Sequence, residues 1–253
     1  MGRTHAATGL LVGAASVPLM NLSSPAAVLA WTAAWGGAAL LPDFDQGGVT
    51  WNEGGFLAKP TGSTVVTMWG WVSWAPARLV GKLAGGHRWG THDPVLAPLA
   101  VAVLALAAGR YPLTQLPLLA VVTGAALHAC APYIPGRLET TTVGNLALSL
   151  TGAWWLTYHA PFTLHWMPLA LAGGTLVHIA GDALTRGGVP RPLATLPRAA
   201  GGRRARMSAD LFVTGDPRFE TPIAVACALT TTVLLVRSTG AWQHVHTLAA
   251  HLP

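Results

Sequence analysis

Long apolar segments, separated by short polar turns, dominate the chain. The segments cover residues 6–20, 25–41, 94–109, 113–131, 143–158, 163–179 and 222–236. Several of them fall short of the roughly 20 residues that a transmembrane helix needs. The pattern predicts an all-α fold: a polytopic helical membrane bundle of about seven apolar helices, forming one domain over residues 1–253.

A further apolar stretch, residues 64–80, has a different character. It contains Trp69, Trp71 and Trp74, and Pro76 interrupts it. Tryptophan is enriched where a membrane meets water. We therefore predict that this stretch forms an interfacial helix and does not cross the membrane.

The composition supports a membrane protein. Hydrophobic residues make up 52% of the chain and charged residues 9%, and the mean hydropathy is +0.47. Soluble domains have roughly 25% charged residues, so this chain could not cover a globular surface with polar groups. An ordinary cytosolic enzyme, a disordered protein and a coiled coil are excluded. Cys130 and Cys227 lie in apolar runs, which predicts buried thiols and excludes a disulfide framework.

The positive charges are unevenly distributed. Seven arginines lie between positions 186 and 218, in a basic loop that we expect at about residues 183–221. A juxtamembrane loop that faces anionic lipid explains such a cluster better than a nucleic-acid site does. We therefore expect membrane lipid as a partner and no nucleic acid; the oligomeric state stays open.

The predicted crossings also sort the cations by side. If residues 64–80 do not cross, thirteen of the fifteen lysines and arginines lie on the side of the N-terminus. Only Arg110 and Arg237 lie on the other side. Because basic residues are enriched in cytoplasmic loops, we expect the side of the N-terminus to be cytoplasmic.

Histidines and aspartates gather at the predicted helix ends on this same side. They come from four stretches that are distant in sequence: His5, then Asp43 and Asp45, then His87, His92 and Asp93, and finally His178 and Asp182. Ionisable residues that share a membrane-protein interior are functional by default. The convergence of four stretches on one membrane face therefore predicts a functional site.

The residue types indicate a metal site. His178 and Asp182 are four residues apart, so they share one face of a helix and can reach the same ion. Imidazole and carboxylate ligands without thiolates suit Zn²⁺, Mn²⁺ or Fe²⁺, and we expect zinc first. Eight candidate ligands exceed one tetrahedral site, which favours two or more ions roughly 3.5–4 Å apart.

Such a site predicts hydrolysis by a metal-activated water. The first ligand candidates are His5, Asp43, His92, His178 and Asp182, and Asp45 and His87 are the next. Asp45 or Asp93 is expected to accept a proton from the attacking water. Arg88 either clamps an anionic oxygen of the substrate or anchors the chain on the positive side of the membrane.

The ordered blocks of these residues resemble a known family. Thr4–His5, Leu40–Asp45, His87–His92 and His178–Val189 look like the motifs of the LexA-regulated, inner-membrane metal-dependent hydrolases of bacteria. The resemblance implies a helical inner-membrane hydrolase with an undefined substrate. Asp93 stands where that family has a small hydroxyl residue. The stretch 214–220 resembles a later block, which adds Glu220 as a candidate ligand.

A more remote resemblance concerns the order of the metal-ligand candidates. A histidine, an aspartate, a histidine and a His-x-x-x-Asp pair follow one another, which is similar to the zinc-dependent phospholipase C and P1 nuclease group. This resemblance implies a phospholipid or another phosphoester as the substrate.

Two alternatives to a hydrolase stay open from the sequence. A metal-ion or small-solute transporter would need its histidines and aspartates at mid-membrane depth, in broken helices. A non-catalytic membrane scaffold would recruit lipid or a partner through the basic loop.

Overall fold

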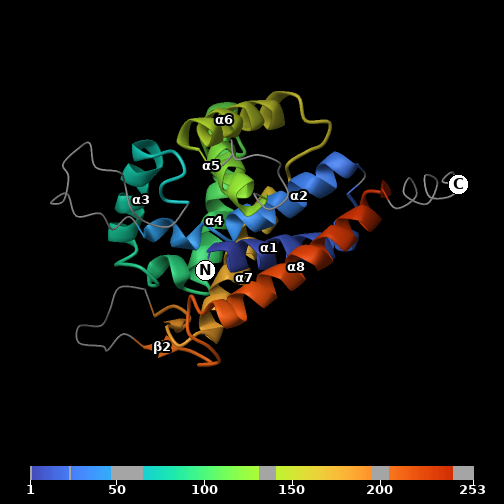
Figure 1. Cartoon of the computed structure of the whole chain (residues 1–253). Coiled ribbons are helices and arrows are strands. Elements are labelled where there is room, and N and C mark those ends of the chain that lie inside the picture. The colour runs from blue at the N-terminus through green and yellow to red at the C-terminus, as the bar shows by residue number, and fades with distance from the viewer. Residues whose placement is uncertain (1, 23, 47–64, 131–140, 195–204, 242–253) are drawn as a thin grey trace, which may run out of the picture.

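The computed structural model describes residues 2–22, 24–46, 65–130, 141–194 and 205–241, and it is built almost entirely from helices (Figure 1). The α-helices are α1 (Gly2–Ser16), α2 (Pro25–Ala38), α3 (Trp71–Leu83), α4 (Leu96–Ala108), α5 (Pro112–Cys130), α6 (Thr142–Tyr158), α7 (Met167–Leu184) and α8 (Pro217–Ser238). Short 3₁₀ helices are η1 (Val17–Leu19), η2 (Pro42–Asp45) and η5 (Gly90–His92). The predicted all-α membrane fold is confirmed.

Local sequence signals explain where two of the long helices begin. Pro25 and Pro217 take the first positions of α2 and α8, where a missing backbone N–H costs little. The residue before each proline caps the helix. Ser24 accepts a hydrogen bond from the amide three residues on, and Asp216 accepts one from the amide two residues on.

The number of membrane-crossing helices differs from the expected seven. Among the described residues, four helices are long and apolar enough to cross: Pro25–Asp45, Pro112–Cys130, Met167–Leu184 and Pro217–Ser238. Each of the seven apolar segments does overlap a helix. However, α1, α4 and α6 have only 15, 13 and 17 residues, so they are too short to span an average bilayer without distortion.

The helices pack closely because small residues lie at their crossings. Helix α1 contacts α2, α7 and α8, while α2 also contacts α5 (Figure 1). A Cβ atom on Gly37 would lie 2.7 Å from the backbone nitrogen of Ala126 in α5, and one on Gly174 would lie 2.5 Å from the carbonyl oxygen of Trp35. These glycines therefore let α2 approach both α5 and α7 to backbone contact.

The stretch at 64–80 corrects one expectation. Helix α3 begins only at Trp71, and the residues just before it form turns. Trp69 and Trp74 are buried inside the protein, and the Trp69 indole donates a hydrogen bond to Asn145 Oδ1 at 2.8 Å. The helix is thus displaced from the predicted 64–80, and two of the three tryptophans pack inside the protein; the position of the helix at the membrane boundary stays a prediction.

The basic loop contains a small β-hairpin that the sequence did not indicate. Strands β1 (Val189–Pro190) and β2 (Arg206–Met207) pair antiparallel. Gly188 has a φ of +57°, a conformation that favours glycine and turns the chain into β1. Strands of two residues show no periodicity, which is why the hydrophobic pattern could not reveal them.

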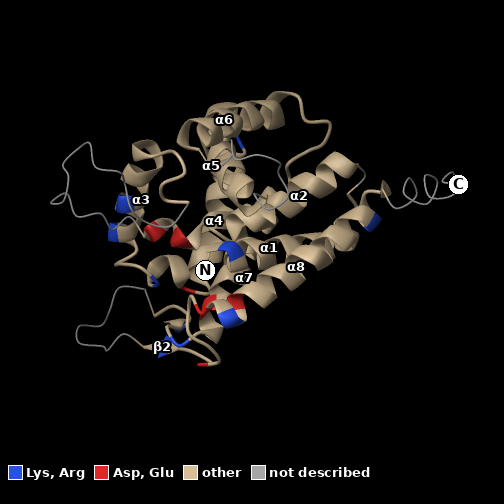
Figure 2. Cartoon of the chain, viewed as in Figure 1, with Lys and Arg blue, Asp and Glu red and all other residues tan. Residues whose placement is uncertain are grey.

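Charged residues are concentrated at one end of the bundle (Figure 2). The beginning of α1, the end of α2, the end of α7 and the beginning of α8 all contribute to this end. The apolar helix bodies form the rest. The fold therefore brings the polar ends of helices from both halves of the chain together.

The Gly37 contact can be tested by substitution. We expect Gly37→Ala to lower the free energy of unfolding by about 1–3 kcal/mol, because the added methyl group would overlap the backbone of α5. Chemical unfolding in detergent measures the change. Ala100→Val, on the exposed face of α4, is the control and should change stability by less than about 0.5 kcal/mol. Equal stability of the two variants would contradict the packing argument.

Candidate metal centre

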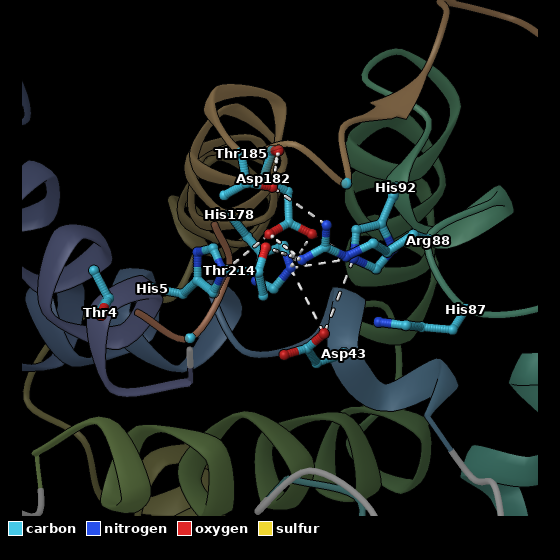
Figure 3. Close-up of polar contacts among 12 residues, drawn as sticks. Thr4, His5, Asp43, His87, Arg88, His92, His178, Asp182, Thr185 and Thr214 are labelled. Atoms are coloured by element: carbon cyan, nitrogen blue, oxygen red, sulfur yellow. Dashed lines mark hydrogen bonds and ion pairs between the residues drawn. The ribbon is translucent and has the colours of Figure 1, made fainter. Parts of the chain in front are cut away.

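Four buried side chains converge at the charged end of the bundle: Asp43 from η2, His92 from η5, and His178 and Asp182 from α7 (Figure 3). His92 Nε2 lies 3.2 Å from His178 Nε2 and 3.5 Å from Asp182 Oδ2. His178 Nε2 lies 3.8 Å from Asp182 Oδ2. Asp43 Oδ1 lies 3.8 Å from His178 Nε2 and 4.0 Å from His92 Nε2. The four atoms thus surround a common point.

These spacings fit a divalent cation. Zinc bonds of about 2.0–2.1 Å put neighbouring ligand atoms of a tetrahedral site about 3.3–3.4 Å apart, within the observed range of 3.2–4.0 Å. Asp182 Oδ2 is buried and has no hydrogen-bond partner among the described residues. A buried oxygen without such a partner costs roughly 1–3 kcal/mol, and a cation at this point would satisfy it.

The charge of the cluster also fits. Asp43, Asp45 and Asp182 are buried carboxylates, and Arg88 is the buried guanidinium beside them. With neutral imidazoles, which metal coordination requires, these four groups have a net charge of −2. Buried charges need compensation, and one divalent cation would provide it.

Hydrogen bonds to a backbone carbonyl and to the Thr91 hydroxyl orient the two histidines. His178 Nδ1 donates to the carbonyl oxygen of Ala39 at 2.7 Å, which leaves the lone pair of Nε2 directed at the cluster. His92 Nδ1 lies 3.0 Å from the Thr91 hydroxyl and 3.6 Å from Asp45 Oδ2. Partners of this kind fix the tautomer and the ring orientation of metal-bound histidines.

Asp45 connects the cluster to an exposed histidine. The Nδ1–H of His87 donates to Asp45 Oδ1 at 2.7 Å, and the Thr91 hydroxyl donates to Asp45 Oδ2. The His87 side chain is 40% exposed, whereas that of Asp45 is fully buried. The Gln46 amide nitrogen lies 2.5 Å from Asp43 Oδ1 and 3.3 Å from His87 Nε2. A continuous polar chain therefore runs from the surface to His92.

Two nitrogen atoms contact the other oxygen of Asp182, Oδ1. His5 Nε2 lies 3.3 Å from Asp182 Oδ1, and Arg88 Nη2 lies 3.0 Å from it. The His5 ring also stacks on the His178 ring, with 3.9 Å between the centroids. Oδ1 is thus bound by the protein, and Oδ2 faces the common point. His5 forms a group of close ligand atoms with His178 and Asp182, so the structure brings this predicted ligand to the cluster.

Arg88 is itself built into the protein. It donates to the Thr185 hydroxyl at 3.3 Å and to the Thr214 hydroxyl at 3.2 Å. A Cβ atom on Gly187 would lie 2.1 Å from Arg88 Nη1, so only glycine leaves room for the guanidinium. These contacts favour an anchor for Asp182 over a free clamp for substrate oxygen.

Asp93 and Glu220 have other partners. Asp93 Oδ1 accepts hydrogen bonds from the amides of Val95, Leu96 and Leu193. This carboxylate therefore caps the start of α4, which argues against the expected proton-accepting role. Glu220 accepts a hydrogen bond from the Gly215 amide at 2.6 Å. It belongs to neither of the two groups of close ligand atoms found among the described residues, so the ligand role expected for Glu220 stays a prediction.

Sequence reasoning missed several residues of the site. Gln46, Thr91, Thr185 and Thr214 all bind a charged member of the cluster. Their hydroxyl and amide groups are common on loops and have no characteristic spacing. Gln46 and Thr91 do lie next to predicted ligands, and this proximity is the signal that could have indicated them.

Comparison with known proteins agrees with the membrane fold. The model of the YdjM inner membrane protein family matches residues 1–134, slightly more than half of the chain. The chain belongs to this family. The match includes Asp43, Asp45, His87 and His92, whereas His178 and Asp182 lie beyond it. No curated protein and no solved structure matches the chain.

Family membership and the four apolar helices together support an inner-membrane protein. The family match is consistent with the sequence resemblance to LexA-regulated inner-membrane proteins. No match supports the remote resemblance to phospholipase C and P1 nuclease.

The ion pair between Arg88 and Asp182 predicts a large effect on stability. We expect Arg88→Gln to lower the free energy of unfolding of the metal-free protein by about 3–5 kcal/mol, because it leaves a buried carboxylate without its cation. Unfolding by denaturant in detergent measures this loss. Arg110→Gln, which removes an exposed charge, should cost under about 0.5 kcal/mol. A loss below about 1 kcal/mol for Arg88→Gln would contradict a buried pair.

Proposed function

We propose that this protein is a membrane-bound, metal-dependent hydrolase and that Asp43, His92, His178 and Asp182 hold its metal ion. The proposal rests on the convergence of four buried ligand atoms. Each of these atoms lies within 4.0 Å of at least two of the other three. The oxygen of Asp182 without a hydrogen-bond partner points to the same place. Metal-assisted hydrolysis is one of the reactions that sites of histidine and carboxylate ligands perform.

Two imidazoles and two carboxylates suit Zn²⁺, with Mn²⁺ and Fe²⁺ as the other candidates. When bound, such an ion lowers the pKa of a coordinated water toward 7 and polarises an ester oxygen. The protein supplies the positions of the ligands. His5 and Arg88 hold Asp182 Oδ1, and Ala39 orients His178.

The proposed site binds one metal ion. A second group of close ligand atoms, from Asp43, His87 and His92, is the candidate position for the additional ion expected from the sequence. It contains Asp43 and His92, two of the four proposed ligands, whereas the other group of close ligand atoms consists of His5, His178 and Asp182. In the structure, the Gln46 amide is already hydrogen-bonded to Asp43 and close to His87, which favours a single ion.

The pair of Asp45 and His87 is the proposed proton acceptor. Its arrangement, a buried carboxylate bound to the Nδ1–H of a partly exposed imidazole, orients the other ring nitrogen to accept a proton. The proton-accepting role expected for Asp45 is thereby assigned to the pair, with His87 as the exposed member.

A phospholipid or another phosphoester is the proposed substrate, and the cytoplasmic side is the proposed location of the site. The ligands lie at helix ends, near the predicted headgroup layer, and the positive-inside rule assigns this end to the cytoplasm. A transporter is disfavoured because its ligands would lie at mid-membrane depth. A non-catalytic scaffold is disfavoured because it would not require the converging ligands.

Metal analysis tests the centre directly. We expect purified protein to contain about one equivalent of a divalent metal, and His178→Gln and Asp182→Asn to lose it. Asp45→Asn should keep the site but bind metal about 10–100-fold more weakly, because it alters only the support of His92. Elemental analysis after dialysis against graded chelator gives both content and affinity.

His159→Ala is the matched control, because it removes an exposed imidazole outside the cluster. Its metal content should equal that of the unmodified protein. Negligible metal in every sample would remove the hydrolase proposal. Two equivalents of metal in the unmodified protein and one in His87→Gln would show that the site binds two ions, and would overturn the single-ion proposal.

Hydrolysis assays separate the proton acceptor from the ligands. We expect His87→Gln to retain its metal and lower kcat on a phosphoester by about 10²–10⁴-fold, the usual contribution of a positioned acid–base group. A panel of phosphomonoesters and phosphodiesters with metal-loaded protein provides the measurement. Unchanged kcat with unchanged metal content would exclude the Asp45–His87 pair from the reaction.

A further inference from the structure

The connection between α7 and α8 presents an exposed surface in which arginines and apolar side chains alternate. We call it the arginine–apolar rim. Its members are Arg186, Arg191, Leu193, Arg206, Met207, Leu211, Val213, Arg218 and Phe219, all of which are exposed.

The apolar members of the rim are large and open. Leu211 is 64% exposed, and Val213 and Phe219 are each 48% exposed. Phe219 follows Arg218 directly, and Met207 follows Arg206 in the same way. Apolar side chains beside guanidinium groups suit the membrane interface. There the apolar side chains insert at the acyl boundary, and the guanidinium groups bind lipid phosphates. A nucleic-acid or water-exposed surface would not favour the exposed leucine, valine and phenylalanine.

The rim lies where the membrane boundary must be. It connects Met167–Leu184 to Pro217–Ser238, two of the helices that are long and apolar enough to cross. The chain leaves one span and enters the next on the same side. The rim residues therefore face the headgroup layer on the side that carries the metal centre.

Direct contacts join the rim to the metal centre. Thr214, between Val213 and Arg218 in sequence, accepts the hydrogen bond from Arg88 at 3.2 Å. Arg206 Nη1 donates to the carbonyl oxygen of Gly187 at 2.9 Å, and Gly187 lies against the Arg88 guanidinium. A group bound at the rim is thus next to the side chains that hold Asp182.

The charge of this connection favours an anionic ligand. Residues 184–220 contain seven arginines but only three acidic residues, Asp210, Asp216 and Glu220. Asp210 pairs with Arg186 at 3.1 Å. Asp216 and Glu220 accept hydrogen bonds from backbone amides at the start of α8. The acids are thus engaged by the protein, whereas Arg191, Arg206 and Arg218 are exposed among the described residues.

We propose that the arginine–apolar rim binds the headgroup of an anionic membrane phospholipid and presents its phosphoester to the metal centre. The inference rests on the proposed hydrolase function and names its substrate class. Arg191, Arg206 and Arg218 bind the headgroup, and Leu211, Val213 and Phe219 contact the acyl region.

Lipid titration of the full chain in detergent tests the rim. Native mass spectrometry counts bound phosphatidylglycerol and phosphatidylcholine with identical acyl chains. We expect phosphatidylglycerol to bind at least tenfold more tightly. Because a basic residue near a lipid surface strengthens binding by about fivefold, Arg191→Gln, Arg206→Gln and Arg218→Gln together should weaken it by roughly a hundredfold. The double variant Arg191→Gln, Arg218→Gln keeps the Arg206–Gly187 hydrogen bond and should show an intermediate loss.

Arg237→Gln is the matched control. It removes an exposed arginine in the last turn of α8, about 28 Å along the helix from Arg218 by the rise per residue, and should leave lipid binding unchanged. Equal binding of the two lipids, or equal losses in the control and triple variants, would overturn the proposal. Competition by glycerol 3-phosphate at the concentration of the lipid would also overturn it, because the ligand would then be a free anion.

Metal content separates this proposal from the one on which it rests. The triple arginine variant should retain its metal while losing phosphatidylglycerol binding. A protein that binds phosphatidylglycerol selectively but contains no metal would remove the hydrolase and leave the lipid surface. A metal-loaded protein that hydrolyses soluble esters without lipid selectivity would remove the lipid surface and leave the hydrolase.

Discussion

The candidate centre depends on the contacts that hold the carboxylate of Asp182. Its two oxygens have different surroundings: His5 and Arg88 hold one, and the other faces His92 and His178. This division ties the end of α7 to the start of α1 and to the loop before η5. Without the first set of contacts, the carboxylate could rotate and the remaining ligands would lose their common point.

The surrounding helices make this arrangement rigid. Glycines at the helix crossings let α2 reach backbone contact with α5 and α7, so the ends of α2 and α7 are fixed relative to each other. Asp43 follows α2, and His178 and Asp182 lie in the last two turns of α7. The distance between ligands on different elements is thus set by backbone packing. Flexible side chains have little freedom to change it.

Much of the centre could be predicted from the sequence because its members follow simple spacing rules. His178 and Asp182 are four residues apart on one helix, and the alternation of apolar segments correctly assigned His5, Asp43 and His92 to the same end. The tertiary partners could not be predicted. Asp93 looks like a ligand by composition, yet it caps α4 through the nearby amides of Val95 and Leu96. Its third partner, the amide of Leu193, is the one that the sequence could not indicate. The burial of Trp69 likewise depends on Asn145, 76 residues away.

The division of the ligands along the chain has a consequence for how the protein is made. Asp43 and His92 belong to the first half of the sequence, whereas His178 and Asp182 emerge from the ribosome much later. Until α7 has been synthesised and has entered the bundle, the early carboxylates and imidazoles lack the groups that complete their surroundings. In the proposed centre, the complete set of four ligands would therefore form only late in biogenesis.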